Sequence, residues 1–290
     1  MTVTGEGGPI VAGIDAVRSW RPTAAWAADE AERRRLPLRL VHGVPPLVHD
    51  ARGFEGDVYH KSLLKRGDEV LDEVAAFVRE RRPGLEVATL LADGGPAQVL
   101  LRQAHHARLV VLGSRRLSRL EEVVSANSVV VPVSAQAACP VVVVVDGEHV
   151  TQQPPYVVVG VDGSDSSEAA VDHAFEAAAL RGADLRALWV WQAPPLGLVD
   201  EPSAIEECRR LLSEAVAGRA GAYPDVQVSH EVVRGHPVEE LAGASEHALA
   251  VVVGRRGRGG FTGMRLGSVP HGLLHHAHCP VVTVPPRDGK

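Results

Sequence analysis

The segment YVVVGVDGSDSSEAAVDHAFEAAAL, Tyr156–Leu180, contains a complete βα unit. Val157–Val161 is a continuous apolar run, which is typical of a strand buried on both faces of a parallel sheet. The polar residues Asp162–Asp165 predict a turn and the N-cap of a helix. Ser167–Leu180 is rich in alanine and places apolar residues at helical spacing, so it predicts an amphipathic helix that packs on the sheet.

The rest of the second half continues this alternation of strands and helices. The pattern predicts strands at Leu185–Trp191, Val226–Val233, Leu249–Val253 and Val281–Val284, and helices at Pro202–Ala220, Pro237–Ala248 and Val269–Ala277. Strands that alternate with helices form right-handed βαβ units. We therefore expect an α/β domain with a doubly wound, five-stranded parallel sheet.

The first half of the chain repeats the second half in a weaker form. The matched pairs are PIVAGID (Pro9–Asp15) with YVVVGVD (Tyr156–Asp162), LRLVHGV (Leu38–Val44) with LRALWVW (Leu185–Trp191), Gly94–Pro96 with Gly235–Pro237, LVVLG (Leu109–Gly113) with AVVVG (Ala250–Gly254), and CPVVV (Cys139–Val143) with CPVVT (Cys279–Thr283). Because these segments recur in the same order, they indicate a duplication. We predict a first domain over residues 1–146, a polar linker GEHVTQQPP at Gly147–Pro155, and a second domain over residues 156–290.

Length and composition fit a globular protein with two domains. The chain has 290 residues, a formal net charge of −6, 45% hydrophobic residues and 23% charged residues, whereas one domain usually has about 100–200 residues. The negative charge argues against nucleic acid as a partner, because nucleic-acid-binding proteins usually present a basic face.

The three cysteines are too widely spaced for a disulfide framework. We find no signal-peptide pattern and no apolar run near the roughly 20 residues of a membrane span, so we expect a cytoplasmic protein.

A glycine-rich segment follows the strand expected at Leu249–Val253. It reads GRRGRGGFTGMRLGSVPHGLL, Gly254–Leu274, and contains several arginines and a Gly267-Ser268 pair before the last helix. Glycine lets the main chain approach a ligand closely, and a helix N-terminus offers free N–H groups to an anion. The segment therefore predicts a phosphate site, with a mobile surface loop as the alternative. It is neither a Walker A loop nor a GxGxxG fingerprint, so neither a P-loop NTPase nor a dinucleotide dehydrogenase is favoured.

The spacing Gly254-x2-Gly257-x9-Gly267-Ser268 matches the nucleotide-binding pattern of the universal stress protein family, in its ATP-binding branch. The segments VVGVDGSDSSEAA and CPVVTV support this match, so the chain resembles a tandem member of that family over nearly its whole length. The resemblance implies two Rossmann-like domains of the adenine nucleotide alpha hydrolase-like type. It also implies an intramolecular pseudo-dimer, paired through the closing strands and related by a pseudo-two-fold axis, and it leaves a homodimer of the whole chain open.

The resemblance further implies the residues of a nucleotide site. Residues after the first two strands would flank the adenine or help to hold a metal ion: Val161 and Val190 for the adenine, and Asp162 for the metal. Residues of the glycine-rich segment would hold the ribose and the phosphates: Gly254, Gly257, Gly267, Ser268 and Val269. The implied cofactor is ATP with Mg²⁺ or Mn²⁺, because hard cations prefer oxygen ligands and usually share phosphates.

The matching segment of the first half, Gly113–Val130, departs from this pattern. Arg116 and Asn127 stand where the second and third glycines would be. Glu121 and Glu122 lie in the same segment and would repel phosphates. We therefore expect the first domain to act mainly as a structural partner of the second.

These features favour an ATP-binding regulatory protein, a nucleotide sensor or switch of stress response or dormancy that acts through an unidentified protein partner. The loop has no catalytic lysine, so we expect no catalytic residues and at most slow ATP hydrolysis or autophosphorylation. Two alternatives stay open: a nucleotide-free interaction scaffold and an ATP-using adenylating enzyme. A ligand such as AMP or a cyclic nucleotide also stays open, because the loop indicates phosphate binding without counting phosphates.

Other residues that could carry chemistry have simpler interpretations. His271 and His275 have an i,i+4 spacing that can bind a metal, yet no further ligand completes a zinc site, so a solvated helix face is favoured. Cys139 and Cys279 each precede an apolar strand, which favours burial as small hydrophobic residues. Trp189 lies on an expected strand, where packing is favoured over stacking on a ligand.

Overall fold

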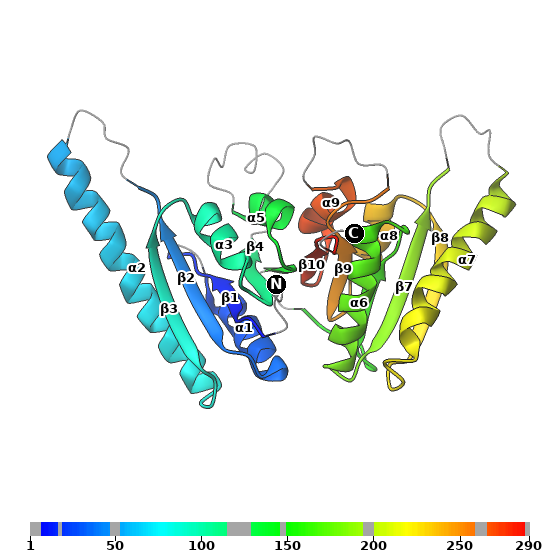
Figure 1. Ribbon diagram of the computed structural model, residues 1–290, viewed down its shortest axis with the longest axis horizontal. Coiled ribbons are helices and arrows are strands. Elements are labelled where there is room, and N and C mark those ends of the chain that lie inside the picture. Colours follow the sequence, from blue (N-terminus) through cyan, green and yellow to red (C-terminus); the bar gives the residue numbers. More distant parts are fainter. Residues whose placement is uncertain are drawn as a thin grey trace, which may run out of the picture. The chain divides into compact units, whose positions relative to one another are not determined.

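The structure is a computed structural model of the chain. It describes residues 7–16, 19–46, 53–114, 129–145, 149–193, 200–258 and 266–287. The chain divides into two compact units, Met1–Asp146 and Gly147–Lys290. Each unit contains parallel strands with helices on both faces of the sheet, which confirms the predicted tandem α/β fold (Figure 1).

The first unit has the strand order β3-β2-β1-β4-β5 among its described residues. Its strands are β1 (Ile10–Gly13), β2 (Leu38–Val44), β3 (Val87–Asp93), β4 (Leu109–Ser114) and β5 (Val141–Val145). Its helices are α1 (Arg21–Arg34), α2 (Gly53–Arg81), α3 (Pro96–Ala104) and α5 (Val130–Gln136). Helices α1 and α2 pack together on one face of the sheet, and α3 and α5 pack together on the other.

The second unit repeats this arrangement with the order β8-β7-β6-β9-β10. Its strands are β6 (Tyr156–Gly160), β7 (Asp184–Trp191), β8 (Val228–Arg234), β9 (Ala250–Gly254) and β10 (Val281–Val284). Its helices are α6 (Asp165–Ala179), α7 (Glu201–Ala220), α8 (Pro237–Ala244) and α9 (Ser268–His276). Helices α6 and α7 cover one face, and α8 and α9 cover the other.

The strand order switches direction beside the first strand of each unit. Strand β1 pairs in parallel with both β2 and β4, and β6 pairs in parallel with both β7 and β9. Ligands of open α/β sheets bind beyond the carboxyl ends of the strands at such a switch. In the second unit, the ends of β6 and β9 therefore position the candidate site.

The predicted bounds of the elements agree closely with the observed ones, and the differences have local causes. Helix α6 begins at Asp165, earlier than the predicted Ser167, because Ser164 caps it. Helix α8 ends at Ala244, earlier than predicted, because the Ser245 hydroxyl donates to a carbonyl of the last turn at 2.6 Å. Serine side chains that bond the nearby backbone in this way compete with helix continuation.

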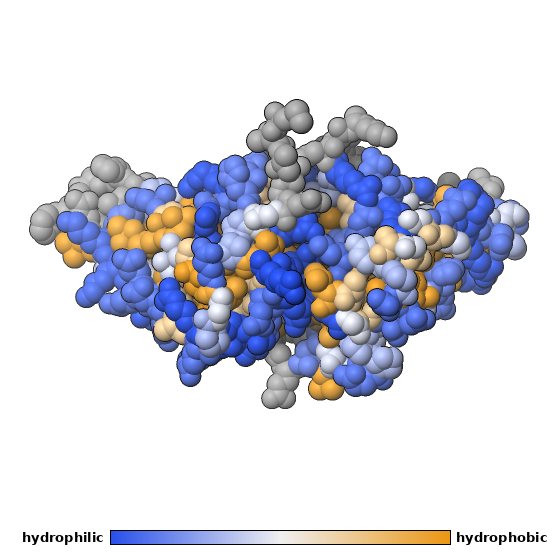
Figure 2. Space-filling view, turned by 60° about the horizontal axis from the view of Figure 1, so that its bottom comes forward, coloured by the Kyte–Doolittle hydropathy of each residue, from blue (hydrophilic) through white to orange (hydrophobic). Residues whose placement is uncertain are grey.

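Valine-rich strands form the centre of each core. Val110 in β4 and Val158 in β6 are fully buried, as expected for strands covered on both faces. Phe175 of α6 is also fully buried and stacks on Tyr223, with ring centroids 5.6 Å apart. The molecular face in Figure 2 is mainly hydrophilic. Within the part of the chain that the structure describes, no helix is long and apolar enough to span a bilayer.

Candidate functional site

The turn after β6 is built by short polar side chains. The Val161 N–H donates to the Leu188 carbonyl at 2.9 Å, so the chain keeps its sheet contact up to the turn. Gly163 follows with a φ of 72°, a conformation that glycine adopts without steric cost. Ser164 is the N-cap of α6, and its Oγ accepts from the Ser167 N–H at 3.2 Å. These contacts fix the direction in which α6 leaves the sheet.

The Asp162 carboxylate joins this turn to the segment after β9. Its Oδ1 accepts from the Ser164 N–H at 3.0 Å and from the Ser164 hydroxyl at 2.7 Å, and its Oδ2 accepts from the Arg258 N–H at 3.2 Å. The Ser164 hydroxyl also lies 3.1 Å from the Arg256 carbonyl. Two segments far apart in the sequence are therefore held together at the strand switch. The role of Asp162 as a metal ligand stays a prediction, and an ion there would share its oxygens with these donors.

Two of the predicted glycines lie where the main chain comes very close to the α6 turn. A Cβ added to Gly257 would lie 2.4 Å from Asp162 Oδ2, and one added to Gly254 would lie 2.7 Å from the Ser166 carbonyl carbon. Real Cβ atoms do not approach other atoms so closely. Gly254 therefore needs glycine for the packing of the backbone itself, whereas a side chain at 257 would have to displace the Asp162 carboxylate.

Gly267, the third glycine of the pattern, has a different environment. It is the N-cap of α9 with a φ of −69°, and its N–H donates to the Arg255 carbonyl at 2.9 Å. Among the described residues, a Cβ on Gly267 would meet no atom closer than 3.4 Å, which is ordinary contact. Ser268 and Val269 follow in the first turn of α9, where N–H groups have no partner within the helix. Packing of the described residues thus does not account for a glycine at 267.

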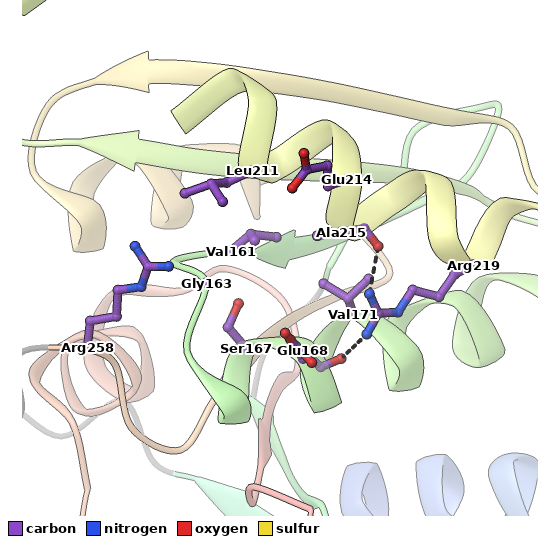
Figure 3. Close-up of a pocket in the computed structure, with 10 residues that line it drawn as sticks. All are labelled: Val161, Gly163, Ser167, Glu168, Val171, Leu211, Glu214, Ala215, Arg219 and Arg258. Atoms are coloured by element: carbon purple, nitrogen blue, oxygen red, sulfur yellow. Dashed lines mark hydrogen bonds between the residues drawn. The ribbon is translucent and has the colours of Figure 1, made fainter. Parts of the chain in front are cut away.

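A cavity of about 240 Å³ lies between α6, α7 and the turn after β6 (Figure 3). Its apolar lining comes from Val161, Val171, Leu211 and Ala215. Sites for drug-sized ligands usually measure about 300–1,000 Å³, so this cavity has room for part of a nucleotide only. Val161 is the predicted site residue that borders it, whereas Val190 on β7 is not among the residues that line it.

Charged side chains line the same cavity. The Arg219 guanidinium donates to the Ala215 carbonyl at 2.8 Å, to the Glu168 carbonyl at 3.4 Å and to Asp172 Oδ1 at 2.7 Å. Arg258 extends from the segment after β9 toward the Gly163 turn (Figure 3). The arginines of the glycine-rich segment predict positive charge here, but the sequence does not say which of them faces the cavity.

Three further lining residues have no signal in the sequence: Glu168, Leu211 and Glu214. They lie on α6 and α7, whose patterns show only amphipathic helices. Their position depends on how the two helices pack over the sheet, which no local motif records.

The structure tests the burial predicted for the cysteines, whereas the interpretation of the histidine pair stays a prediction. The rings of His271 and His275 lie 5.1 Å apart between centroids, but the described residues contain no group of three or more side chains that could hold a metal ion. Cys139, Cys208 and Cys279 are free thiols. Cys139 and Cys279 are buried as predicted, and burial raises the pKa of each thiol to about 12.

The first unit has a different turn at the corresponding place. The Ile14 N–H donates to the Val41 carbonyl at 2.9 Å, which matches the Val161 contact, and the Ile14 carbonyl lies 2.7 Å from His42 Nδ1. Trp20 caps α1 without any side-chain hydrogen bond to the helix. The predicted departures at Arg116, Glu121, Glu122 and Asn127 lie outside the described residues.

Fold and site together define a tandem α/β protein with a glycine-rich segment at the strand switch of its second unit. The family model for the universal stress protein family matches residues 8–145 and 156–285. The chain therefore belongs to the universal stress protein family.

Similar proteins span the whole chain. A universal stress protein of Mycolicibacterium smegmatis is 35% identical over 292 residues, covering 96% of this chain and 97% of that protein. One from Mycobacterium tuberculosis is 34% identical over 288 residues, covering 94% and 95%. The crystal structure of a universal stress protein from Archaeoglobus fulgidus has a TM-score of 0.76 at 19% identity and covers 98% of both chains, so it shares the fold.

Proposed function

We propose that the second unit binds an adenine nucleotide, ATP in the first place, and that the protein acts as a regulatory nucleotide sensor or switch. The observation that carries this proposal is the convergence of three segments at the switch beyond β6 and β9. The Asp162 carboxylate binds the Arg258 N–H, and the Gly267 N–H binds the Arg255 carbonyl. The turn after β6, the segment after β9 and the start of α9 are thereby joined where open α/β sheets bind ligands.

The start of α9 supports the phosphate part of this proposal. The N–H groups of Ser268 and Val269 lie in a first helical turn, which suits an anion through free donors and the helix dipole. A ligand that approaches the α-carbon of Gly267 would give this position a reason to be glycine. The neighbouring cavity, with apolar walls such as Val161 and Leu211, would take the base or the ribose.

The donor set fits a divalent cation that is held mainly by phosphates. Asp162 lies on the proposed phosphate side, and both of its oxygens accept hydrogen bonds from the chain. Mg²⁺ is usually bound through one or two carboxylates together with phosphates and water. When bound, the ion would neutralise phosphate charge, while Asp162 would hold the turn and the Gly257–Arg258 segment in place.

Regulation would follow from a change in population. A nucleotide that contacts both the Asp162 turn and the start of α9 favours the conformation in which these segments are joined. At a ligand concentration of about 100 times Kd, this coupling stabilises the binding conformation by about 2.7 kcal/mol. A partner protein that contacts the same edge would then distinguish the two states.

Isothermal titration of ATP with Mg²⁺ tests the proposal on three forms of the full chain: wild type, Gly267→Val and Asn127→Val. All three are first freed of co-purified nucleotide. We expect one site, lost in Gly267→Val and kept in Asn127→Val, the matched position of the first unit. A Cβ at 267 meets only ordinary contacts among the described residues, so this variant should fold, which circular dichroism checks. If the wild type takes up no ATP, the nucleotide-sensor proposal is wrong.

A further inference from the structure

Arg258 occupies an unusual position at the mouth of the cavity between α6 and α7. Its N–H donates to Asp162 Oδ2 at 3.2 Å, so its backbone is anchored on the turn after β6. Its guanidinium carbon lies 5.6 Å from the centroid of the Trp189 ring, within the range of a cation–π contact. Backbone and side chain are thus both placed by contacts with other elements of the unit.

The guanidinium also uses the space that Gly163 leaves open. A Cβ on Gly163 would lie 2.4 Å from an Arg258 guanidinium nitrogen and 2.8 Å from its central carbon. Figure 3 shows the side chain crossing from the β9 segment toward this turn, on the side of the cavity that Leu211 lines. The absence of a side chain at 163 therefore lets the planar group lie directly against the cavity mouth.

The positive charge of Arg258 is available to a ligand. Within the described parts of the chain, its guanidinium contacts the Trp189 ring and has no carboxylate at ion-pair distance. Its charge does act on Glu207 of α7, whose pKa is lowered first by Arg210 and to a smaller extent by Arg258. Arg219, the other arginine that lines the cavity, binds Asp172 and two backbone carbonyls instead. Of these two cations, Arg258 is the one that can pair with an incoming anion without breaking an existing ion pair.

From this geometry we propose that Arg258 is a specificity-determining residue that selects phosphorylated ligands over the corresponding nucleosides. The inference rests on the proposed nucleotide site. It names Arg258 as the side chain that distinguishes a charged phosphate ligand from an uncharged nucleoside. Guanidinium groups bind phosphate oxygens through two parallel N–H···O bonds, and a stack on an aromatic face fixes the plane of the group. Trp189 below and Gly163 beside the guanidinium would hold it ready for the phosphate at the edge of the cavity.

The test compares the affinities of adenosine and ATP with Mg²⁺ for the full chain. Wild type, Arg258→Gln and Arg209→Gln are titrated with both ligands. Arg209 is a matched control, because it is an exposed arginine of the second unit whose partner is Glu206 at 3.1 Å and which does not line the cavity. Arg258 is exposed, so its replacement leaves the core intact.

We expect wild type to prefer ATP over adenosine, and Arg258→Gln to reduce that preference about tenfold or more, the scale of a lost charge-assisted hydrogen bond. Adenosine affinity should fall much less than ATP affinity in Arg258→Gln, because adenosine carries no phosphate, and both affinities should stay unchanged in Arg209→Gln. If wild type binds ATP but the preference survives in Arg258→Gln, or falls equally in Arg209→Gln, this inference is wrong while the proposed function stands. If wild type binds neither ligand, both fall.

Discussion

The first helix of each unit starts in a different way, although both units have the same strand order. Helix α6 begins at a polar cap, in which Ser164 and Asp162 bond the backbone and Asp162 reaches the segment after β9. Helix α1 begins after Trp20, whose ring meets Phe77 of α2 edge to face with centroids 5.3 Å apart. The N-terminus of α6 is held by hydrogen bonds, one of which also binds the segment after β9. The N-terminus of α1 is held by an aromatic contact between α1 and α2.

In the first unit, an arginine also lies against the aromatic pair at the N-terminus of α1. The Arg21 guanidinium carbon lies 4.9 Å from the Trp20 ring centroid and 5.3 Å from that of Phe77. In the second unit, the cavity of about 240 Å³ lies between the first two helices. The two units thus share their strand order, while the residues that follow the first strand differ and start the first helix in different ways.

The largest difference between the units is expected for the glycine near the end of the fourth strand, Gly254 in β9 and Gly113 in β4. A Cβ on Gly254 meets the Ser166 backbone at 2.7 Å, whereas among the described residues a Cβ on Gly113 meets the side chain of Thr23, whose hydroxyl would lie 2.5 Å away. Because the close atoms belong to the backbone of α6 and cannot move aside as a side chain can, Gly254→Ala should destabilise its unit by about 1–3 kcal/mol, as overpacking does. Gly113→Ala should cost less, and Thr23→Ala should remove that cost. Denaturant unfolding followed by hydrogen exchange in β9 and β4 measures both units within the full chain.

This comparison breaks if the two alanine variants are equally stable. It also breaks if Thr23→Ala leaves the cost of Gly113→Ala unchanged, because a contact other than the Thr23 hydroxyl would then limit that position. Hydrogen exchange is needed here because a protein with two units need not unfold in one step, and a single midpoint would mix their stabilities.

Much of the fold could be predicted from the sequence because its determinants are local. The run Val157–Val161 is apolar on both faces, and Asp162–Asp165 supplies turn and cap residues in order, so the βα unit is expected without any tertiary information. The sequence also marks Gly254 and Gly257, whose close approach to the α6 turn the structure explains.

The remaining part of the site depends on long-range packing. Leu211 and Glu214 reach the cavity only because α7 crosses beside α6, and the sequence of α7 shows a surface helix and nothing more. The sequence predicts that Trp189 packs within the protein rather than on a ligand, and its side chain is buried. Its contact with Arg258, however, joins residues far apart in the chain. Such pairs follow from the strand order, which local periodicity does not contain.

A smaller difference is expected at the helix caps. Ser164→Ala removes the acceptor of the Ser167 N–H and the donor to Asp162, so it should destabilise α6 by about 1 kcal/mol, the usual cost of losing an N-cap. Ser19→Ala is the matched change before α1, where the exposed Ser19 precedes an N-cap that makes no side-chain bond. It should change stability by less than about 0.5 kcal/mol. Hydrogen exchange of the amides in α6 and α1 measures both effects. If the two variants change the protection of their helices equally, the N-termini of α6 and α1 do not differ as described.

No difference between the units is expected for the pH dependence of stability that comes from the matched cysteines before β5 and β10. Burial raises the pKa of Cys139 and of Cys279 from an ordinary value of 9.0 to about 12. Folding therefore favours the neutral thiol, and this stabilisation is complete below pH 9 and lost as the pH rises from 9 toward 12. Above pH 9, each thiol should lower the free energy of unfolding of its unit by about 1.4 kcal/mol per pH unit.

Cys139→Ala and Cys279→Ala isolate these two contributions from the other groups that titrate in the same range. Urea unfolding at pH 8 and pH 10 should show that each variant loses less stability than wild type, by a similar amount and only in its own unit. A much steeper loss for one thiol would mean that the two cores do not exclude water equally. The asymmetry between the units would then extend from the turns after the strands into the closing strands themselves.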